Sequence, residues 1–169
     1  METNLILMDA ERIRRSVKRM AYEIMEKNRE DKPVFLFGID HRGFALSQLL
    51  EEILNEISGG RVRTVQLPVK KDVSGEDFEK LASVEVADCM PIVVDDVIFS
   101  GQTMFKALSR ISDSLEPEEI HTAVLVDRGH RKFPILAEFY GMELPTKLNE
   151  HVSVSVDNME VEGVTLQKV

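Results

Sequence analysis

Short apolar runs of strand length alternate with helical segments, and this alternation constrains the fold more than any other feature. The runs are "VFLFGI" at 34–39, "VRTVQL" at 62–67, "PIVVDD" at 91–96 and "IHTAVLVD" at 120–127. Continuous apolar runs of this length are typical of strands that are covered on both faces. Strands that alternate with helices predict an α/β domain built on a mostly parallel sheet flanked by helices.

The helical segments are marked by apolar spacing and by their ends. Asp9–Asn28 is predicted as an amphipathic helix with Asp9 as its N-cap, and "FALSQLLEEILNEI" as a helix that ends at Gly59–Gly60. A third helix is predicted after the turn at 100–103, and "HVSVSV" at 151–156 is predicted as the last strand. No linker divides residues 1–169, which we expect to form one domain.

Composition narrows the class of protein. The net charge of −9 disfavours non-specific binding of nucleic acid, although the basic residues Arg12, Arg14, Arg15, Lys18 and Arg19 crowd near the N-terminus. The single cysteine, Cys89, excludes an internal disulfide and fits a cytoplasmic protein. No secretory signal is expected, and no segment approaches the ~20 apolar residues that span a bilayer.

Three predicted strands end in unusual polar segments, "GIDHRG", "VVDDVIFSGQT" and "LVDRGHRKFP". Ligands of open α/β sheets bind outside the carboxyl ends of the strands. We therefore expect the chemistry at this edge of the sheet.

The turn Ser100–Thr103 has the residues of an anion site. Gly101 permits a positive φ or a close ligand approach, and the helix that follows would present its unpaired N–H groups. The hydroxyls of Ser100 and Thr103 add donors, so a phosphate monoester would fit. Taken alone, the same residues also fit an ordinary helix cap.

Asp95 and Asp96 end a buried strand as neighbouring carboxylates, which repel each other and lose hydration. A cation or the hydroxyl groups of a ligand would compensate, and ribose offers two vicinal hydroxyls. Successive strand side chains point in opposite directions, so we expect the two acids to have different partners. The alternative is that one or both face solvent.

The stretch "IVVDDVIFSGQT" resembles the phosphoribosyl-pyrophosphate-binding motif of type I phosphoribosyltransferases. The chain is similar, over residues 7–156, to the family of bifunctional pyrimidine-operon regulators with uracil phosphoribosyltransferase activity (PyrR). "RIRRSVKRMAYEIMEKN" is similar to the first helix of that family, "GIDHRGFALSQLL" to its pyrophosphate loop and "AVLVDRGHRKFPILAEFYGMELPT" to its base-site and hood segment.

The resemblance implies a role for each of these segments. Asp95 and Asp96 would bind the ribose hydroxyls, directly or through Mg²⁺ and water, and with Arg42 would be the catalytic residues. The 5-phosphate would bind at Phe99, Ser100, Gly101, Gln102 and Thr103. Pyrophosphate would bind at the loop formed by Asp40, His41, Arg42 and Gly43, and at Lys70 and Lys71. The base would lie near Val97, Ile98, Asp127 and Arg128.

Residues 68–80 are polar and carry Pro and Gly, so we expect a mobile active-site loop there, and residues 127–150 are expected to form a small hood over the base. The segment 66–86 lacks the acidic-aromatic-basic signature of the family, so the identity of the nucleobase is not fixed. The predicted reaction is transfer of phosphoribosyl from phosphoribosyl pyrophosphate to a nucleobase, with uracil first and a purine second.

A nucleotide-sensing, RNA-binding regulator with weak or no catalysis is the alternative function. The first helix carries Lys18, Arg19 and Tyr22 where the family expects a Thr-Arg pair and a His, whereas His130 and Arg131 match its second basic patch. A phospho-acceptor signalling domain is a third alternative. Such a domain carries its acid pair on the first strand, whereas the pair in this chain comes on a later strand. The family associates, so we expect a homodimer or larger assembly and no membrane partner.

Overall fold

The computed structural model describes residues 3–70 and 88–169. Its centre is a sheet of five parallel strands in the order β3-β2-β4-β5-β6. The strands are β2 (Val34–Ile39), β3 (Val62–Leu67), β4 (Met90–Ile98), β5 (His121–Asp127) and β6 (Phe139–Glu143). The predicted mostly parallel α/β sheet is therefore confirmed, and its carboxyl ends meet at one edge.

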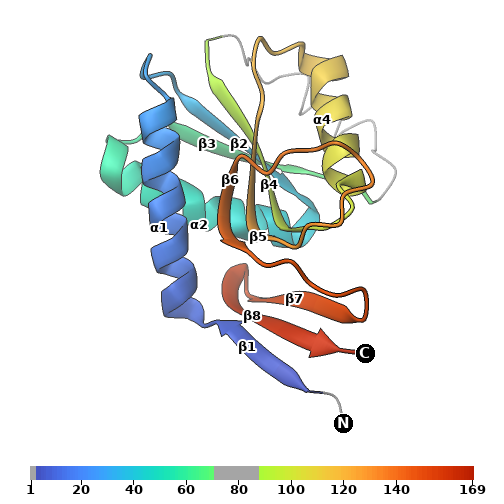
Figure 1. Cartoon of the computed structure of the whole chain (residues 1–169). Coiled ribbons are helices and arrows are strands. Elements are labelled where there is room, and N and C mark those ends of the chain that lie inside the picture. The colour runs from blue at the N-terminus through green and yellow to red at the C-terminus, as the bar shows by residue number, and fades with distance from the viewer. Residues whose placement is uncertain (1–2, 71–87) are drawn as a thin grey trace.

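The helices α1 (Ala10–Lys27), α2 (Asp40–Ser58) and α4 (Gln102–Leu115) flank this sheet. Side chains of α1 and α2 share one apolar core with the sheet, whereas those of α4 share a second core with the opposite face. Because both faces are covered, all six residues of β2 are buried, and the continuous apolar run follows from this position. Figure 1 shows α4 apart from α1 and α2, across the sheet.

A second sheet, antiparallel and in the order β1-β8-β7, lies beside the first. It is formed by β1 (Asn4–Met8), β7 (Glu150–Asp157) and β8 (Glu160–Lys168), which come from the two ends of the chain (Figure 1). Met8, Val152, Val154 and Val164 bury their side chains in the core that α1 and α2 share with the large sheet. The small sheet is thus packed onto the helical layer.

Several boundaries differ from the sequence predictions. Asp9 caps α1 as expected, because its carboxylate accepts the backbone N–H of Arg12 over 2.8 Å. The segment 40–43 was predicted as a loop but forms the first turn of α2, since the helix begins directly at Asp40. The strand at 151–156 is not the last, because β8 pairs with it, and β1 was not predicted.

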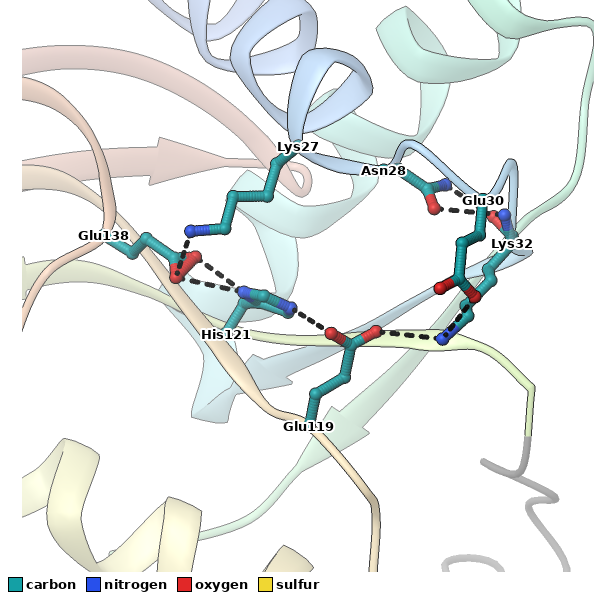
Figure 2. A network of polar contacts seen from close by, with 7 residues as sticks. All are labelled: Lys27, Asn28, Glu30, Lys32, Glu119, His121 and Glu138. Carbon is teal, nitrogen blue, oxygen red and sulfur yellow. Dashed lines mark hydrogen bonds and ion pairs between the residues drawn. The ribbon is translucent and has the colours of Figure 1, made fainter.

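The opposite end of the large sheet carries a network of polar contacts. Figure 2 shows the ring of His121, the first residue of β5, between two carboxylates. Its Nδ1 lies 2.6 Å from Glu138, its Nε2 lies 3.3 Å from Glu119, and Lys27 and Lys32 pair with these acids. The buried imidazole thereby has a partner at each nitrogen, as a buried polar group requires.

No helix among residues 3–70 and 88–169 is both long and apolar enough to cross a membrane.

Candidate functional site

Two adjoining cavities open at the carboxyl ends of the parallel strands. The larger encloses about 740 Å³ and the smaller about 300 Å³, and both are lined by Arg42, Lys70, Asp96 and Val97. Asp40, His41, Asp95 and Thr103 also line the smaller cavity, whereas Phe99, Arg128 and residues 148–154 line the larger. The two cavities are therefore compartments of one cleft, and Asp96 lies where they meet.

Asp95 and Asp96 occupy different environments, as their positions on β4 predict. Asp95 is 9% exposed, and its carboxylate accepts the backbone N–H of Asp96 over 2.8 Å. Burial raises the pKa of Asp95 well above its ordinary value, and the charge of Asp96 raises it further, while the charge of Lys70 lowers it. Asp96 is half-buried and lines both compartments, which makes it the acid that a ligand reaches.

Glycine lets the first turn of α2 approach the acids. A Cβ on Gly43 would lie 2.6 Å from the carbonyl oxygen of Val94 and 3.3 Å from Cα of Asp95. A Cβ on Gly38 would lie 2.4 Å from Cα of Phe44, so β2 and α2 are also in close contact. Only glycine fits at these two points, and the cleft depends on both.

Arg42 extends from this first turn into both compartments. Its Nε donates to the carbonyl oxygen of Val154 over 3.0 Å, which ties the side chain to β7. A guanidinium carries further N–H donors on its two terminal nitrogens. Arg42 can therefore present fixed donors to an anion while β7 holds its stem.

Asp40 binds the protein's own backbone. It adopts a left-handed conformation with φ of 49°, and its Oδ1 accepts the N–H of Val69 over 2.8 Å. Its carbonyl oxygen accepts from the Nε2 of Gln66 over 2.8 Å. These contacts fasten the residues after β3 to the start of α2. Lys70 lies at this point and lines both compartments, whereas Lys71 and the rest of the predicted 68–80 loop, residues 72–80, lie outside the described residues.

The turn before α4 has the backbone of an anion site. Gly101 has a φ of 83°, and a Cβ there would meet the carbonyl oxygen of Phe133 at 3.2 Å. The hydroxyl of Ser100 accepts the N–H of Gln102 over 3.3 Å, and α4 begins at Gln102. Thr103 faces the smaller compartment. Apart from the N–H of Gln102, which donates to Ser100, the N–H groups that open this helix have no intrahelical acceptor and can bind an anion.

The residues that were predicted to contact a base divide into two groups. Val97 and Arg128 line the larger compartment, but Ile98 is 3% exposed within the core beneath α4. The carboxylate of Asp127 accepts the N–H of Gly129 and pairs with Arg131, each over 2.9 Å. Asp127 therefore shapes its own turn.

Phe99 and Arg128 form a stacked pair that the sequence did not reveal. The guanidinium of Arg128 lies 4.3 Å from the ring centroid of Phe99, and its Nε donates to Thr146 over 2.9 Å. Arg128 is 6% exposed, and burial lowers its pKa. Phe99 was predicted to lie at the phosphate, but its side chain lines the larger compartment. The pair offers a flat surface to a planar ligand.

The small sheet supplies one wall of the larger compartment through residues 150–154 of β7, and residues 148 and 149, which precede β7, extend this wall. The alternation in "HVSVSV" predicts a strand, but it carries no signal for the sheet to which that strand belongs or for the cleft it faces. Thr146, which precedes this strand, was likewise not singled out.

The basic cluster of α1 is largely engaged by acids and carbonyl groups. Arg14 pairs with Glu52 and Glu56, and Arg15 with Glu11. Arg19 pairs with Glu23 and donates to the carbonyl oxygens of Tyr140 and Gly141.

The second basic patch is engaged in the same way. Arg131 donates to the carbonyl oxygens of Ile135 and Phe99 and pairs with Asp127, while the Nε2 of His130 contacts the carbonyl oxygen of Thr146. Both basic patches thus contribute to the fold.

Comparison with known proteins agrees with this geometry. Residues 5–158 match the model of the phosphoribosyl transferase domain. The chain is 35% identical over 174 residues to the bifunctional protein PyrR of Ligilactobacillus salivarius, covering 96% of this chain and 98% of that protein. It is 36% identical over 170 residues to the protein of the same name from Bacillus pumilus, covering 95% and 94%.

Among solved structures, the fold resembles a Leishmania tarentolae HGPRT-ase in complex with GMP, with a TM-score of 0.77, 18% identity and coverage of 98% of both chains. It also resembles the hypoxanthine phosphoribosyltransferase of Trypanosoma cruzi, with a TM-score of 0.74, 19% identity and coverage of 96% and 95%. The acid pair, the glycine turn and the arginine-bearing helix turn lie in one cleft of a chain that matches the domain model almost end to end. The protein therefore belongs to the phosphoribosyl transferase domain family.

Proposed function

We propose that this protein transfers the 5-phosphoribosyl group from phosphoribosyl pyrophosphate to a nucleobase, with uracil as the base and UMP and pyrophosphate as the products. The observation that carries the proposal is the arrangement of one cleft. It holds the half-buried acid Asp96 between a helix N-terminus with a left-handed glycine and a pair of cations, Arg42 and Lys70.

Each part of the ligand has a matching part of the cleft. The turn at Ser100–Thr103 receives the 5-phosphate on backbone N–H groups. Asp96 accepts hydrogen bonds from the ribose hydroxyls, while Asp95, buried beneath it, fixes the Asp96 backbone over 2.8 Å. Arg42, Lys70 and the first turn of α2 receive the pyrophosphate, since phosphoryl oxygens are bound by fixed donors and positive charge.

The reaction exchanges two bonds at C1 of the ribose. The bond from C1 to the pyrophosphate oxygen breaks, and its electron pair leaves with that oxygen. A bond from C1 to the base nitrogen forms, and that nitrogen loses its proton. Positive charge develops on the sugar and negative charge on the leaving group. Catalysis consists of positioning and electrostatic stabilisation, for which Asp96 lies on the sugar side and Arg42 and Lys70 on the side of the leaving group.

Mg²⁺ fits this donor set as a partner of the substrate. Mg²⁺ is commonly held by one or two carboxylates together with substrate phosphates, and Asp96, with Asp95 behind it, provides such carboxylates. No cluster of three or more acidic, histidine or cysteine side chains suited to a metal occurs in the part of the chain that the structure describes. The ion would neutralise charge on the leaving pyrophosphate.

The choice of base is supported by the relatives and by the larger compartment. Proteins named bifunctional protein PyrR match this chain over nearly their whole length, which favours uracil. The two solved structures described above are an HGPRT-ase and a hypoxanthine phosphoribosyltransferase, so a purine is the second candidate. In either case the base would stack near Phe99, whose ring rests on Arg128.

An RNA-binding regulator that senses nucleotides is the second candidate function, because the relatives are named bifunctional. In this chain Arg14, Arg15 and Arg19 are paired with acids, which weakens their attraction to phosphates. We therefore place the enzyme first.

Pyrophosphate release tests the proposal. The protein is incubated with phosphoribosyl pyrophosphate and Mg²⁺ and one of uracil, hypoxanthine, guanine, xanthine, adenine or orotate. We expect release with uracil and its loss in the Asp95→Asn/Asp96→Asn protein. Folded protein that binds uridylate yet turns over no base would contradict the enzyme and favour the regulator, which salt-sensitive, uridylate-enhanced binding of a pyrimidine-leader RNA would support.

A further inference from the structure

The tripeptide Pro68–Lys70, directly after β3, is held by two side chains from opposite sides. The guanidinium of Arg110, on α4, donates to the carbonyl oxygens of Pro68 and Val69. The Oδ1 of Asp40, on α2, accepts the N–H of Val69 over 2.8 Å and faces the N–H of Lys70 at 3.5 Å. The side chain of Val69 is 5% exposed in the core beneath α4.

These contacts leave only the side chain of Lys70 free to enter the cleft. It lines both compartments, and its charge lowers the pKa of Asp95 against the raising effects of burial and of Asp96. Lysine is a flexible cation that loses rotamer entropy when it is held in place, so holding its backbone still reduces the cost of placing the ammonium group.

We propose that Arg110 and Asp40 are positioning residues that clamp the backbone before Lys70 and so set its ammonium group for the diphosphate end of the ligand. The inference rests on the proposed function for the identity of that ligand. The charge of Asp40 fits this positioning role, because a carboxylate accepts backbone N–H groups but repels phosphate oxygens. The inference also assigns a role to Arg110, about two helical turns beyond the phosphate turn of the same helix.

A double-mutant cycle in ligand binding tests this arrangement. The variants are Lys70→Ala, Arg110→Leu and the double variant, and the measurement is calorimetric binding of phosphoribosyl pyrophosphate with Mg²⁺. Lys70→Ala is expected to weaken binding about ten- to a hundredfold, the loss of one charge-assisted hydrogen bond. Arg110→Leu is expected to weaken it about tenfold, and the double variant no further than Lys70→Ala. Effects that multiply in the double variant would overturn the clamp.

Matched variants separate positioning from folding. Lys106→Leu removes an exposed cation of α4 one turn before Arg110 and is expected to leave binding unchanged. Asp40→Asn keeps an oxygen acceptor and is expected to retain binding, whereas Asp40→Ala is expected to behave like Arg110→Leu. Equal losses in Asp40→Asn and Asp40→Ala would contradict the role given to Asp40.

Amide hydrogen exchange measures the clamp without any ligand. The N–H groups of Val69 and Lys70 are expected to be protected in the wild-type protein and to exchange at least tenfold faster in Asp40→Ala and Arg110→Leu. Unprotected amides in the wild type would overturn the inference. Wild-type protein with protected amides that binds neither phosphoribosyl pyrophosphate nor pyrophosphate would instead overturn the proposed function and the ligand assigned to Lys70.

Discussion

The backbone N–H of Asp96 donates to the carboxylate of Asp95 over 2.8 Å, so the buried acid holds the backbone of its half-buried neighbour. Asp95 is 9% exposed and borders only the smaller compartment of the cleft, whereas Asp96 borders both compartments. The two adjacent carboxylates therefore differ in environment, and the difference follows from the alternation of side chains along β4.

Asp95 is expected to make stability depend on pH. Its folded-state pKa is raised above the ordinary 3.8 by burial first and by Asp96 second. Between 3.8 and the raised value, the folded state holds a proton that the unfolded state releases, so the free energy of unfolding falls as the pH rises through this window. Urea unfolding of Asp95→Asn from pH 4 to pH 8 should show a stability relative to wild type that increases with pH. A difference that stays constant with pH would contradict this account.

Gly43→Ala is expected to destabilise the protein, because its Cβ would lie 2.6 Å from the carbonyl oxygen of Val94, which is backbone and cannot move aside cheaply. Overpacking of this kind costs about 1–3 kcal/mol in the free energy of unfolding. Gly59→Ala is the matched control. It has nothing within 4 Å and pays only for its left-handed φ of 76°. Denaturant unfolding measures the stability of both variants. A binding measurement made alongside should show a loss of ligand affinity for Gly43→Ala alone.

Thr146→Val removes the acceptor for the Nε of Arg128 in a buried position. An unsatisfied buried donor costs about 1–3 kcal/mol, so the free energy of unfolding should fall by that amount. Thr64→Val is the control of identical chemistry, since Oγ1 of Thr64 is buried without a hydrogen-bond partner in the described part of the chain. It should be neutral or stabilising. Equal losses from both substitutions would argue against the Arg128 contact.

The polar network of Figure 2 is expected to support stability and not binding, because it lies at the amino end of β5, away from the cleft. Glu138→Leu deprives the buried ring of His121 of its partner at 2.6 Å and should lower the free energy of unfolding by about 1–3 kcal/mol. Glu30, at the exposed outer end of the network, should tolerate replacement by Gln. Affinity for phosphoribosyl pyrophosphate should be unchanged in both variants.

The elements that local patterns specify were predictable, and those that depend on distant pairing were not. The run 34–39 and the cap at Asp9 are local signals, and both were confirmed. In contrast, β1 pairs with β8 across almost the whole chain, from Asn4 to Gln167, and no local pattern encodes that contact. The small sheet, and with it one wall of the cleft, was therefore missed.

The site shows the same division. Residue type and adjacency in the sequence are enough to single out Asp95, Asp96 and Gly101 as candidates. Arg110 and Thr146 act through contacts with residues 42 and 18 positions away in sequence, which only the folded chain brings together. Asp40 was predicted as a pyrophosphate-binding residue, but its contact with the N–H of Val69 was not predicted.

We propose that the acids, the glycine turn and the two cations bind one ligand, and competition binding distinguishes one ligand from several. Affinities are measured by calorimetry with Mg²⁺ for ribose 5-phosphate, for pyrophosphate and for phosphoribosyl pyrophosphate. We expect phosphoribosyl pyrophosphate to bind more tightly than either fragment, to displace both, and to lose at least tenfold in affinity in the Asp96→Asn protein. Fragments that bind without being displaced, or a whole ligand that binds no more tightly than its parts, would contradict the proposal.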